Sequence, residues 1–198
     1  MKYVLLDNGH GSNTAGKCSP DKSILEYKYN RNVTAAIVDR LKGYANIKPI
    51  LVVPELYDVP LSDRVRRINK WCALYGPSNC IMISCHVNAA GRGEWKNARG
   101  WSVWTTRGQN NSDKLATLCY NNATKRLDGI ATTIKDVKDG DPDYEANFYI
   151  IKGANCPAIL TESLFMDNKQ DVAILKSEKG FNAIVDLHVD TILQWFSK

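Results

Sequence analysis

The sequence predicts an α/β fold in which helices flank a parallel or mostly parallel β-sheet. Two patterns predict this fold. Apolar segments of strand length alternate along the chain with segments of helical periodicity, as in proteins built from strand–helix–strand units. The apolar segments are continuous, which is typical of strands buried on both faces. The chain has 198 residues, so we expect one domain that spans residues 1–198.

The first half of the chain contains three expected strands and two expected helices. Gly43 ends the first helix, and Gly76-Pro77 ends the second, because neither residue type favours helix continuation. Ser62 is a suitable N-cap for the second helix. We expect strands at Tyr3–Asp7, Ile47–Val53 and Cys80–Cys85, and helices at Glu26–Lys42 and Ser62–Tyr75.

The second half of the chain continues the alternation. Segments rich in glycine and charged residues interrupt it, and one of them is acidic and contains proline. We therefore expect loops there. The expected strands are Trp101–Thr106, Phe148–Ile151 and Ala158–Thr161, the helices are Ser112–Asp128 and Phe181–Phe196, and the loops are Gly91–Gly100 and Lys135–Glu145.

Charge and hydropathy exclude several classes of protein. The net charge is +5 and the basic residues are scattered, so nucleic acid is not an expected partner. Four basic residues cluster on a helical pattern that predicts a solvated helix face, namely Arg64, Arg66, Arg67 and Lys70. No apolar run approaches the ~18 to 20 residues of a membrane helix, so we expect no membrane insertion. The apolar start is too short for a signal peptide, which predicts synthesis in the cytoplasm.

The six cysteines include no Cys-x-x-Cys pair, which excludes zinc ribbons and thioredoxin-type motifs. Because no secretion signal is visible, buried free thiols are the expected state.

Four side chains suited to chemistry are expected at one edge of the sheet. His10, His86 and Glu162 each follow an expected strand, and ligands of parallel sheets bind at the carboxyl ends of strands. Glu26 opens a helix whose apolar positions share its face at helical spacing, so it points inward. A buried carboxylate needs a partner, which is either a metal cation or a buried arginine.

Two imidazoles and one carboxylate with an open position form a known arrangement for catalytic zinc, in which a second glutamate acts as general base. A metal-free site with charge-paired glutamates fits the same spacing. The third histidine, His188, lies on the apolar stripe of the last helix, so we interpret it as a residue at the edge of the core.

Four short motifs occur in the order and at the spacing of a known enzyme family. They are Leu6-Asp7-Asn8-Gly9-His10-Gly11, Glu26, Ile83-Ser84-Cys85-His86-Val87-Asn88-Ala89 and Pro157-Ala158-Ile159-Leu160-Thr161-Glu162. Together they resemble the zinc-dependent N-acetylmuramoyl-L-alanine amidases of type 3, a family that includes catalytic domains of endolysins and autolysins. The resemblance extends from residue 4 to about residue 175. One departure is Leu164, where the family often has glycine.

The resemblance implies a fold, a cofactor and a reaction. The implied fold is a three-layer α/β structure with a mainly parallel or mixed sheet of about six strands. One zinc ion per chain is implied, with His10, Glu26 and His86 as its ligands and Glu162 as the catalytic acid/base. The implied reaction is hydrolysis of the amide bond between N-acetylmuramic acid and L-alanine in peptidoglycan, by a monomer that reaches the bacterial cell wall after release or export.

Contacts with substrate are less determined by the motifs. Asn88 belongs to the second histidine motif. Trp95 suits a sugar or peptide face, or packs on its own loop, and we expect that loop and the 135–145 loop to wall the groove. Lys152 suits a substrate carboxylate, or is an ordinary surface lysine. Two other functions remain open: another zinc amide hydrolase, either a peptidase or a deacetylase, and an inactive module that binds cell wall.

Overall fold

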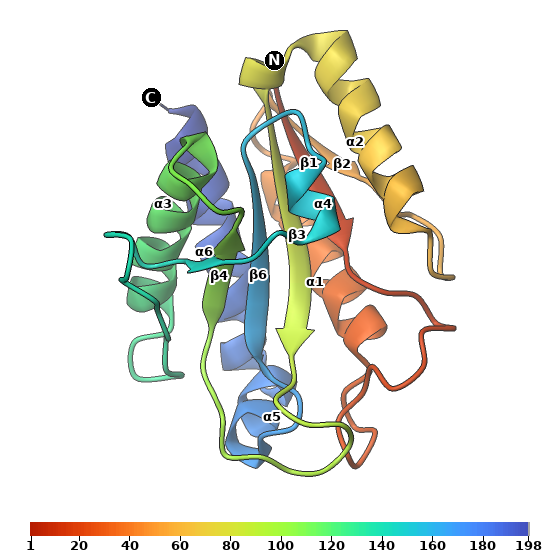
Figure 1. Ribbon diagram of the computed structural model, residues 1–198, viewed down its shortest axis with the longest axis vertical. Coiled ribbons are helices and arrows are strands. Elements are labelled where there is room, and N and C mark those ends of the chain that lie inside the picture. Colours follow the sequence, from red (N-terminus) through yellow and green to blue (C-terminus); the bar gives the residue numbers. More distant parts are fainter. Residues whose placement is uncertain (198) are drawn as a thin grey trace.

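The computed structural model describes residues 1–197 and contains a six-stranded sheet in the order β2-β1-β3-β6-β4-β5 (Figure 1). The neighbouring strands pair in parallel except β4 and β6, which pair antiparallel. The predicted mainly parallel, mixed sheet is therefore confirmed. The elements are β1 (Lys2–Asn8), α1 (Glu26–Leu41), β2 (Ile47–Leu51), α2 (Leu61–Tyr75), η1 (Pro77–Asn79), β3 (Cys80–Asn88), β4 (Ser102–Thr105), α3 (Asn111–Arg126), β5 (Tyr144–Glu145), α4 (Tyr149–Lys152), β6 (Ala158–Phe165), α5 (Lys169–Lys176) and α6 (Glu178–Phe196).

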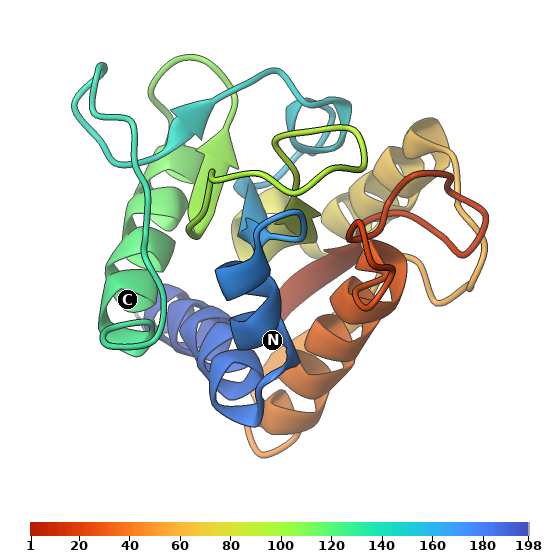
Figure 2. The ribbon, with the colours of Figure 1, turned by 90° about the horizontal axis from the view of Figure 1, so that it is seen from below.

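Helices cover both faces of the sheet, so the chain has three layers (Figure 2). The larger core lies between the sheet and α1, α3, α5 and α6. A smaller core lies on the opposite face, beneath α2 and α4. Burial on both faces explains why the central strands β1, β3 and β6 each contain a run of consecutive apolar residues.

Helix α1 buries the face that its spacing predicts. Val33, Ile37 and Leu41 are buried in the larger core, and Glu26 and Asn30 are buried on the same face. The inward direction of Glu26 is thus confirmed, because the apolar residues that follow it at helical spacing fix the rotation of the helix against the sheet.

Helix α2 differs from its prediction. Its buried residues are Arg64, Ile68 and Cys72, whereas Leu61 and Tyr75 are 51% and 40% exposed. The interpretation of Arg64 as part of a solvated face is therefore wrong. Arg64 lies one and two turns before the two buried apolar residues, so the rotation that buries them also buries its guanidinium.

The region around β6 contains the other corrections. The expected strand Phe148–Ile151 is the short helix α4, because a run of four apolar residues suits a buried helical turn as well as a strand. The 135–145 loop contains the two-residue strand β5, and α5 was not predicted. Strands β3 and β6 extend beyond their expected ends because they stay paired as far as Asn88 and Phe165.

The cysteines agree with the expected free thiols. All six cysteines lie within residues 1–197 and are free, and five of them are buried. Over the same residues, no helix combines the length and the apolar character that a membrane crossing requires.

Candidate active site

Three potential metal ligands converge beside the carboxyl ends of β1 and β3. They are His10, Glu26 and His86, and one ligand atom from each lies within 4.8 Å of the others. His10 Nε2 is 3.4 Å from Glu26 Oε2, and His86 Nδ1 is 3.0 Å from Glu26 Oε1. The two imidazole rings meet edge to face, with centroids 5.0 Å apart. The sequence prediction that these side chains lie together is therefore supported by their placement.

Each residue is held by a different element. Glu26 is the first residue of α1, and its Oε1 accepts a hydrogen bond from the backbone N–H of Val87 at 3.1 Å. His86 lies within β3. His10 follows β1 with a φ of 66°, a left-handed conformation that few non-glycine residues adopt. The Arg31 guanidinium donates to the His10 carbonyl at 2.9 Å, which holds this backbone in place.

Gly9 allows His86 to approach β1 closely. A Cβ atom at Gly9 would lie 2.1 Å from the nearest atom of the His86 ring, which is far inside van der Waals contact. The absence of a side chain at residue 9 is thus a steric requirement of the histidine position.

Burial and neighbouring charges shift the pKa values of the three residues in opposite directions. Burial lowers the pKa of His10 to about 4, against the attraction of Glu26. Burial also disfavours the charged forms of Glu26 and His86, but their hydrogen bond and opposite charges outweigh it, so the pKa of Glu26 falls and that of His86 rises. At neutral pH, His10 is therefore an uncharged imidazole with a lone pair available to a cation.

Glu162 lies beside this cluster on the neighbouring strand. It pairs in register with His86 across β3 and β6, so both side chains leave the same face of the sheet. Its Oε2 is buried and has no hydrogen-bond partner among residues 1–197. Burial raises the pKa of Glu162 to about 7; the positive charge of His86 opposes this rise, and the negative charge of Glu26 adds to it. A carboxyl group with this pKa can both accept and return a proton near neutral pH.

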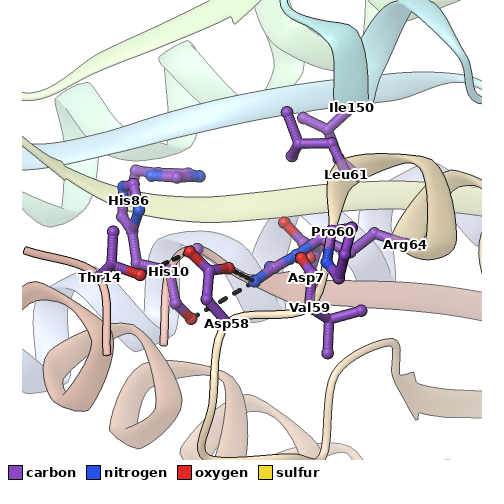
Figure 3. Close-up of a pocket in the computed structure, with 11 residues that line it drawn as sticks. Asp7, His10, Thr14, Asp58, Val59, Pro60, Leu61, Arg64, His86 and Ile150 are labelled. Carbon is purple, nitrogen blue, oxygen red and sulfur yellow. Dashed lines mark hydrogen bonds and ion pairs between the residues drawn. The ribbon is translucent and has the colours of Figure 1, made fainter. Parts of the chain in front are cut away.

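The cluster borders a cavity of about 490 Å³ on the α2 and α4 face of the sheet. Figure 3 shows His10 and His86 toward one end of this cavity and Arg64 and Val59 toward the other. Ile150 of α4 also lines it. Carboxylates, imidazoles and an apolar wall therefore surround a space large enough for part of a substrate.

Arg64 forms ion pairs and hydrogen bonds at the far end of the cavity. Its guanidinium is 2% exposed and lies 2.7 Å from Asp7 Oδ1 and 2.8 Å from Asp58 Oδ1. It also donates to the backbone carbonyls of Asn8 and Val59, at 3.0 and 2.8 Å. Sequence reasoning missed this group, although the helical spacing of Arg64, Ile68 and Cys72 was a visible signal.

The three residues expected to contact substrate lie in different parts of the structure. Asn88 ends β3, two residues after His86. Trp95 packs against the larger core, with the Lys169 ammonium 5.7 Å from its ring centroid. Lys152 borders a separate cavity near the start of β3 and β6. Neither Trp95 nor Lys152, nor any residue of the 135–145 loop, lines the cavity that holds His10 and His86.

Two further residues have structural explanations. His188 is fully buried, and its ring bonds to the Thr161 hydroxyl at 3.0 Å and the Ile184 carbonyl at 2.7 Å. It therefore belongs to the interior rather than to the edge of the core. Leu164 has a φ of 66°, a conformation that glycine adopts without strain, and its buried side chain packs in the larger core.

The donor set fits a zinc ion. Ligand atoms that share one tetrahedral zinc at ~2.1 Å lie about 3.4 Å apart, and the distances of 3.4 and 3.0 Å from Glu26 to the two histidines are close to this value. Glu26 Oε2 is buried and has no hydrogen-bond partner in the described part of the chain. An orphaned carboxylate oxygen between two imidazoles is an expected feature of a site prepared for a cation.

A comparison with protein families gives a match that spans most of the chain. The profile of the N-acetylmuramoyl-L-alanine amidase family matches residues 4–194. The chain belongs to this family. The match includes all four residues of the site, His10, Glu26, His86 and Glu162.

Curated relatives of the chain include members from a phage and a bacterium. The chain is 25% identical over 197 residues to the endolysin of Bacillus phage SPP1, with 98% of this chain and 65% of the relative covered. It is 23% identical over 202 residues to the N-acetylmuramoyl-L-alanine amidase CwlM of Bacillus licheniformis, with 100% and 70% covered. The chain thus spans about two thirds of the length of these amidase relatives.

Solved structures of amidases have the same fold. An N-acetylmuramoyl-L-alanine amidase from Clostridium difficile 630 superimposes with a TM-score of 0.81 at 21% identity, covering 100% of this chain and 97% of the other. The catalytic domain of CwlV, an N-acetylmuramoyl-L-alanine amidase from Paenibacillus polymyxa, gives 0.80 at 20% identity, covering 100% and 99%. These likenesses confirm the three-layer α/β architecture.

Proposed function

We propose that the chain is a zinc-dependent hydrolase that cleaves the amide bond between N-acetylmuramic acid and L-alanine in bacterial peptidoglycan. The observation that carries the proposal is the convergence of His10, Glu26 and His86 with Glu162 in register beside them. Family membership supports the choice of bond. The relatives that are named endolysin and amidase support the cell wall as the place of action.

The residues divide into a metal site and a proton-transfer group. His10, Glu26 and His86 would hold the zinc. When bound, zinc acts as a Lewis acid that polarises the substrate carbonyl and lowers the pKa of a coordinated water to about 7. Glu162 accepts the proton of the attacking water and returns it to the alanine nitrogen as the carbon–nitrogen bond breaks. The products are a free lactyl carboxylate on the glycan and a free amine on alanine.

Glu162 suits proton transfer better than metal binding. Its pairing with His86 places it next to the cluster, but it is not one of the three converging ligands. The pKa of about 7 means that it exchanges a proton near the pH at which the reaction would proceed. Glu26, in contrast, has a lowered pKa and remains an anion, as a metal ligand requires.

Digestion of purified peptidoglycan tests the proposal. We expect new N-terminal alanine in proportion to enzyme and no new reducing sugar ends, because only the muramoyl–alanine amide is cut. New amines on residues other than alanine would show that the enzyme cleaves a peptide bond and is a peptidase. Reducing ends without free alanine would show that the glycan is cleaved instead.

Gly9→Ala should lower the affinity for zinc although no ligand residue is substituted. The wild-type protein is expected to contain about one zinc per chain by elemental analysis. An added Cβ would displace the His86 ring, and we expect the zinc affinity to fall roughly 10- to 100-fold, as for other changes that misplace a ligand. Gly43→Ala is the matched control, since nothing lies within 4 Å of its added Cβ. Full zinc affinity in Gly9→Ala would contradict the ligand role of His86.

A further inference from the structure

A second group of potential ligands lies away from the amidase site. It contains Asp113, Asp141 and Asp143, whose ligand oxygens all lie within 4.8 Å of one another. Asp113 is in the first turn of α3, and the other two come from the 135–145 loop. All three donors are carboxylates, whereas the amidase site combines imidazoles with a carboxylate. This group lies beyond the end of β4 at Thr105, and β4 runs antiparallel to β6 and away from Glu162.

Within the described residues, the burial of these carboxylates is not offset by nearby positive charge. Asp113 and Asp143 are 2% and 0% exposed. Burial raises the pKa of Asp143 to about 8. The carboxyl-to-carboxyl contact with Asp141 and the negative charges of Asp141 and Asp113 add to this rise in pKa, and the Thr105 hydroxyl opposes it. Like charges that are buried together require either a proton or a cation between them.

The available hydrogen-bond donors do not satisfy the oxygens. The Thr105 hydroxyl faces both Asp113 Oδ1 and Asp143 Oδ2 but has one proton to donate. The Asn110 N–H and the Gln109 amide bind one further oxygen each, on Asp113 and Asp141. The Oδ1 atoms of Asp141 and Asp143 are buried and have no hydrogen-bond partner within residues 1–197. Glu26 Oε2 has the same property in the amidase site.

We propose that Asp113, Asp141 and Asp143 bind one calcium ion. Calcium takes six to eight oxygen ligands at 2.3–2.6 Å, so two oxygens on one ion are separated by at most about 5 Å, and the observed 4.8 Å limit satisfies this. A cavity of about 580 Å³ is lined by Asp113 and Asp141 and provides space for water ligands. An all-oxygen donor set excludes the soft metals that prefer thiolates and favours calcium over zinc.

Calcium at this position would connect three parts of the fold. Asp113 belongs to α3, Thr105 ends β4, and Asp143 precedes β5, whose loop continues into α4. Without an ion, Asp141 and Asp143 of this loop lie against Asp113 of α3 as carboxylates that repel one another. The ion would therefore stabilise the edge of the sheet, independently of whether the chain is an amidase.

Calorimetric titration of the zinc-loaded protein with calcium tests the proposal. Prior saturation with zinc prevents a response of the amidase site. We expect one calcium per chain, and a rise in Tm of roughly 5 to 10 °C at a hundredfold excess over Kd. Asp143→Asn and the half-buried Asp141→Asn should each weaken binding at least tenfold. Asp136→Asn removes the same charge from the same loop outside the cluster and should bind as the wild type does.

Three outcomes would overturn the calcium site. The first is the absence of both heat and a Tm shift with calcium. The second is undiminished binding in Asp141→Asn and Asp143→Asn. The third is an equal response to magnesium at the same concentration, which would show that the site does not have the size and ligand number of a calcium site. A rise in Tm of Asp143→Asn without calcium, together with no binding by the wild type, would assign a shared proton instead.

Discussion

Glu162→Gln should lose at least ~10²- to 10⁴-fold in activity on peptidoglycan while its zinc content stays at the wild-type value. The amide keeps the size of the side chain but cannot accept the proton of the attacking water. Burial already disfavours the ionised carboxylate, as its raised pKa indicates. The neutral amide should therefore leave the free energy of unfolding unchanged or higher. Turnover and zinc content, measured on the same preparation, check this prediction.

Glu26→Gln is the matched comparison, since it makes the same chemical change at the same edge of the sheet. Glu26 contacts both histidines, so we expect it to lose zinc and activity together. The two roles are exchanged if Glu162→Gln loses zinc while Glu26→Gln retains it. Near wild-type turnover by Glu162→Gln would remove the acid/base role altogether.

Arg64→Ala should lower the free energy of unfolding by about 3 to 5 kcal/mol, the usual cost of removing one partner of a buried ion pair. Asp7 is 1% exposed, and after the substitution the Ser84 hydroxyl would be its one remaining side-chain partner among residues 1–197. Chemical denaturation measures the change. Activity should fall as well, because the same guanidinium donates to the Asn8 carbonyl in the segment that leads to His10.

Two controls separate the buried pair from a general effect on α2. Arg66→Ala removes an exposed guanidinium from the same helix and should leave stability almost unchanged. In the described part of the chain, this guanidinium pairs with Asp63 alone. In the double variant Arg64→Ala/Asp7→Asn the uncompensated charge is absent. The decrease in its free energy of unfolding should therefore be smaller than the sum of the decreases in the two single variants. Additive losses, or a loss from Arg64→Ala no larger than that from Arg66→Ala, would contradict this account.

The predictable parts of the fold are those with a regular pattern of apolar residues along the chain. Helix α1 was predicted with its rotation because Val33, Ile37 and Leu41 repeat at helical spacing, and this rotation carried Glu26 to the interior. The central strands were predicted because burial on both faces leaves an unbroken apolar run. The meeting of His10, His86 and Glu162 at one edge then followed from the rule that the carboxyl ends of parallel strands lie together.

The parts that were not predictable depend on partners distant in the sequence. The spacing of Arg64, Ile68 and Cys72 indicates that Arg64 is buried, but nothing near Arg64 in the sequence shows that Asp7 is the partner of its guanidinium. The four residues 148–151 suit a helix or a strand equally until packing against α2 and β6 selects the helix. Likewise, the acidic 135–145 loop looked like a wall of the groove, but its aspartates meet Asp113 at the far end of β4.

Hydrolysis of peptidoglycan in water enriched in the heavy oxygen isotope, followed by mass spectrometry, tests the central claim most directly. Attack of water on the muramoyl–alanine carbonyl places the heavy oxygen in the lactyl carboxylate of the glycan and none in the released peptide. We expect this label with the wild-type protein and its loss with Glu162→Gln. Heavy oxygen at a sugar anomeric carbon, or in a peptide carboxylate, would contradict it.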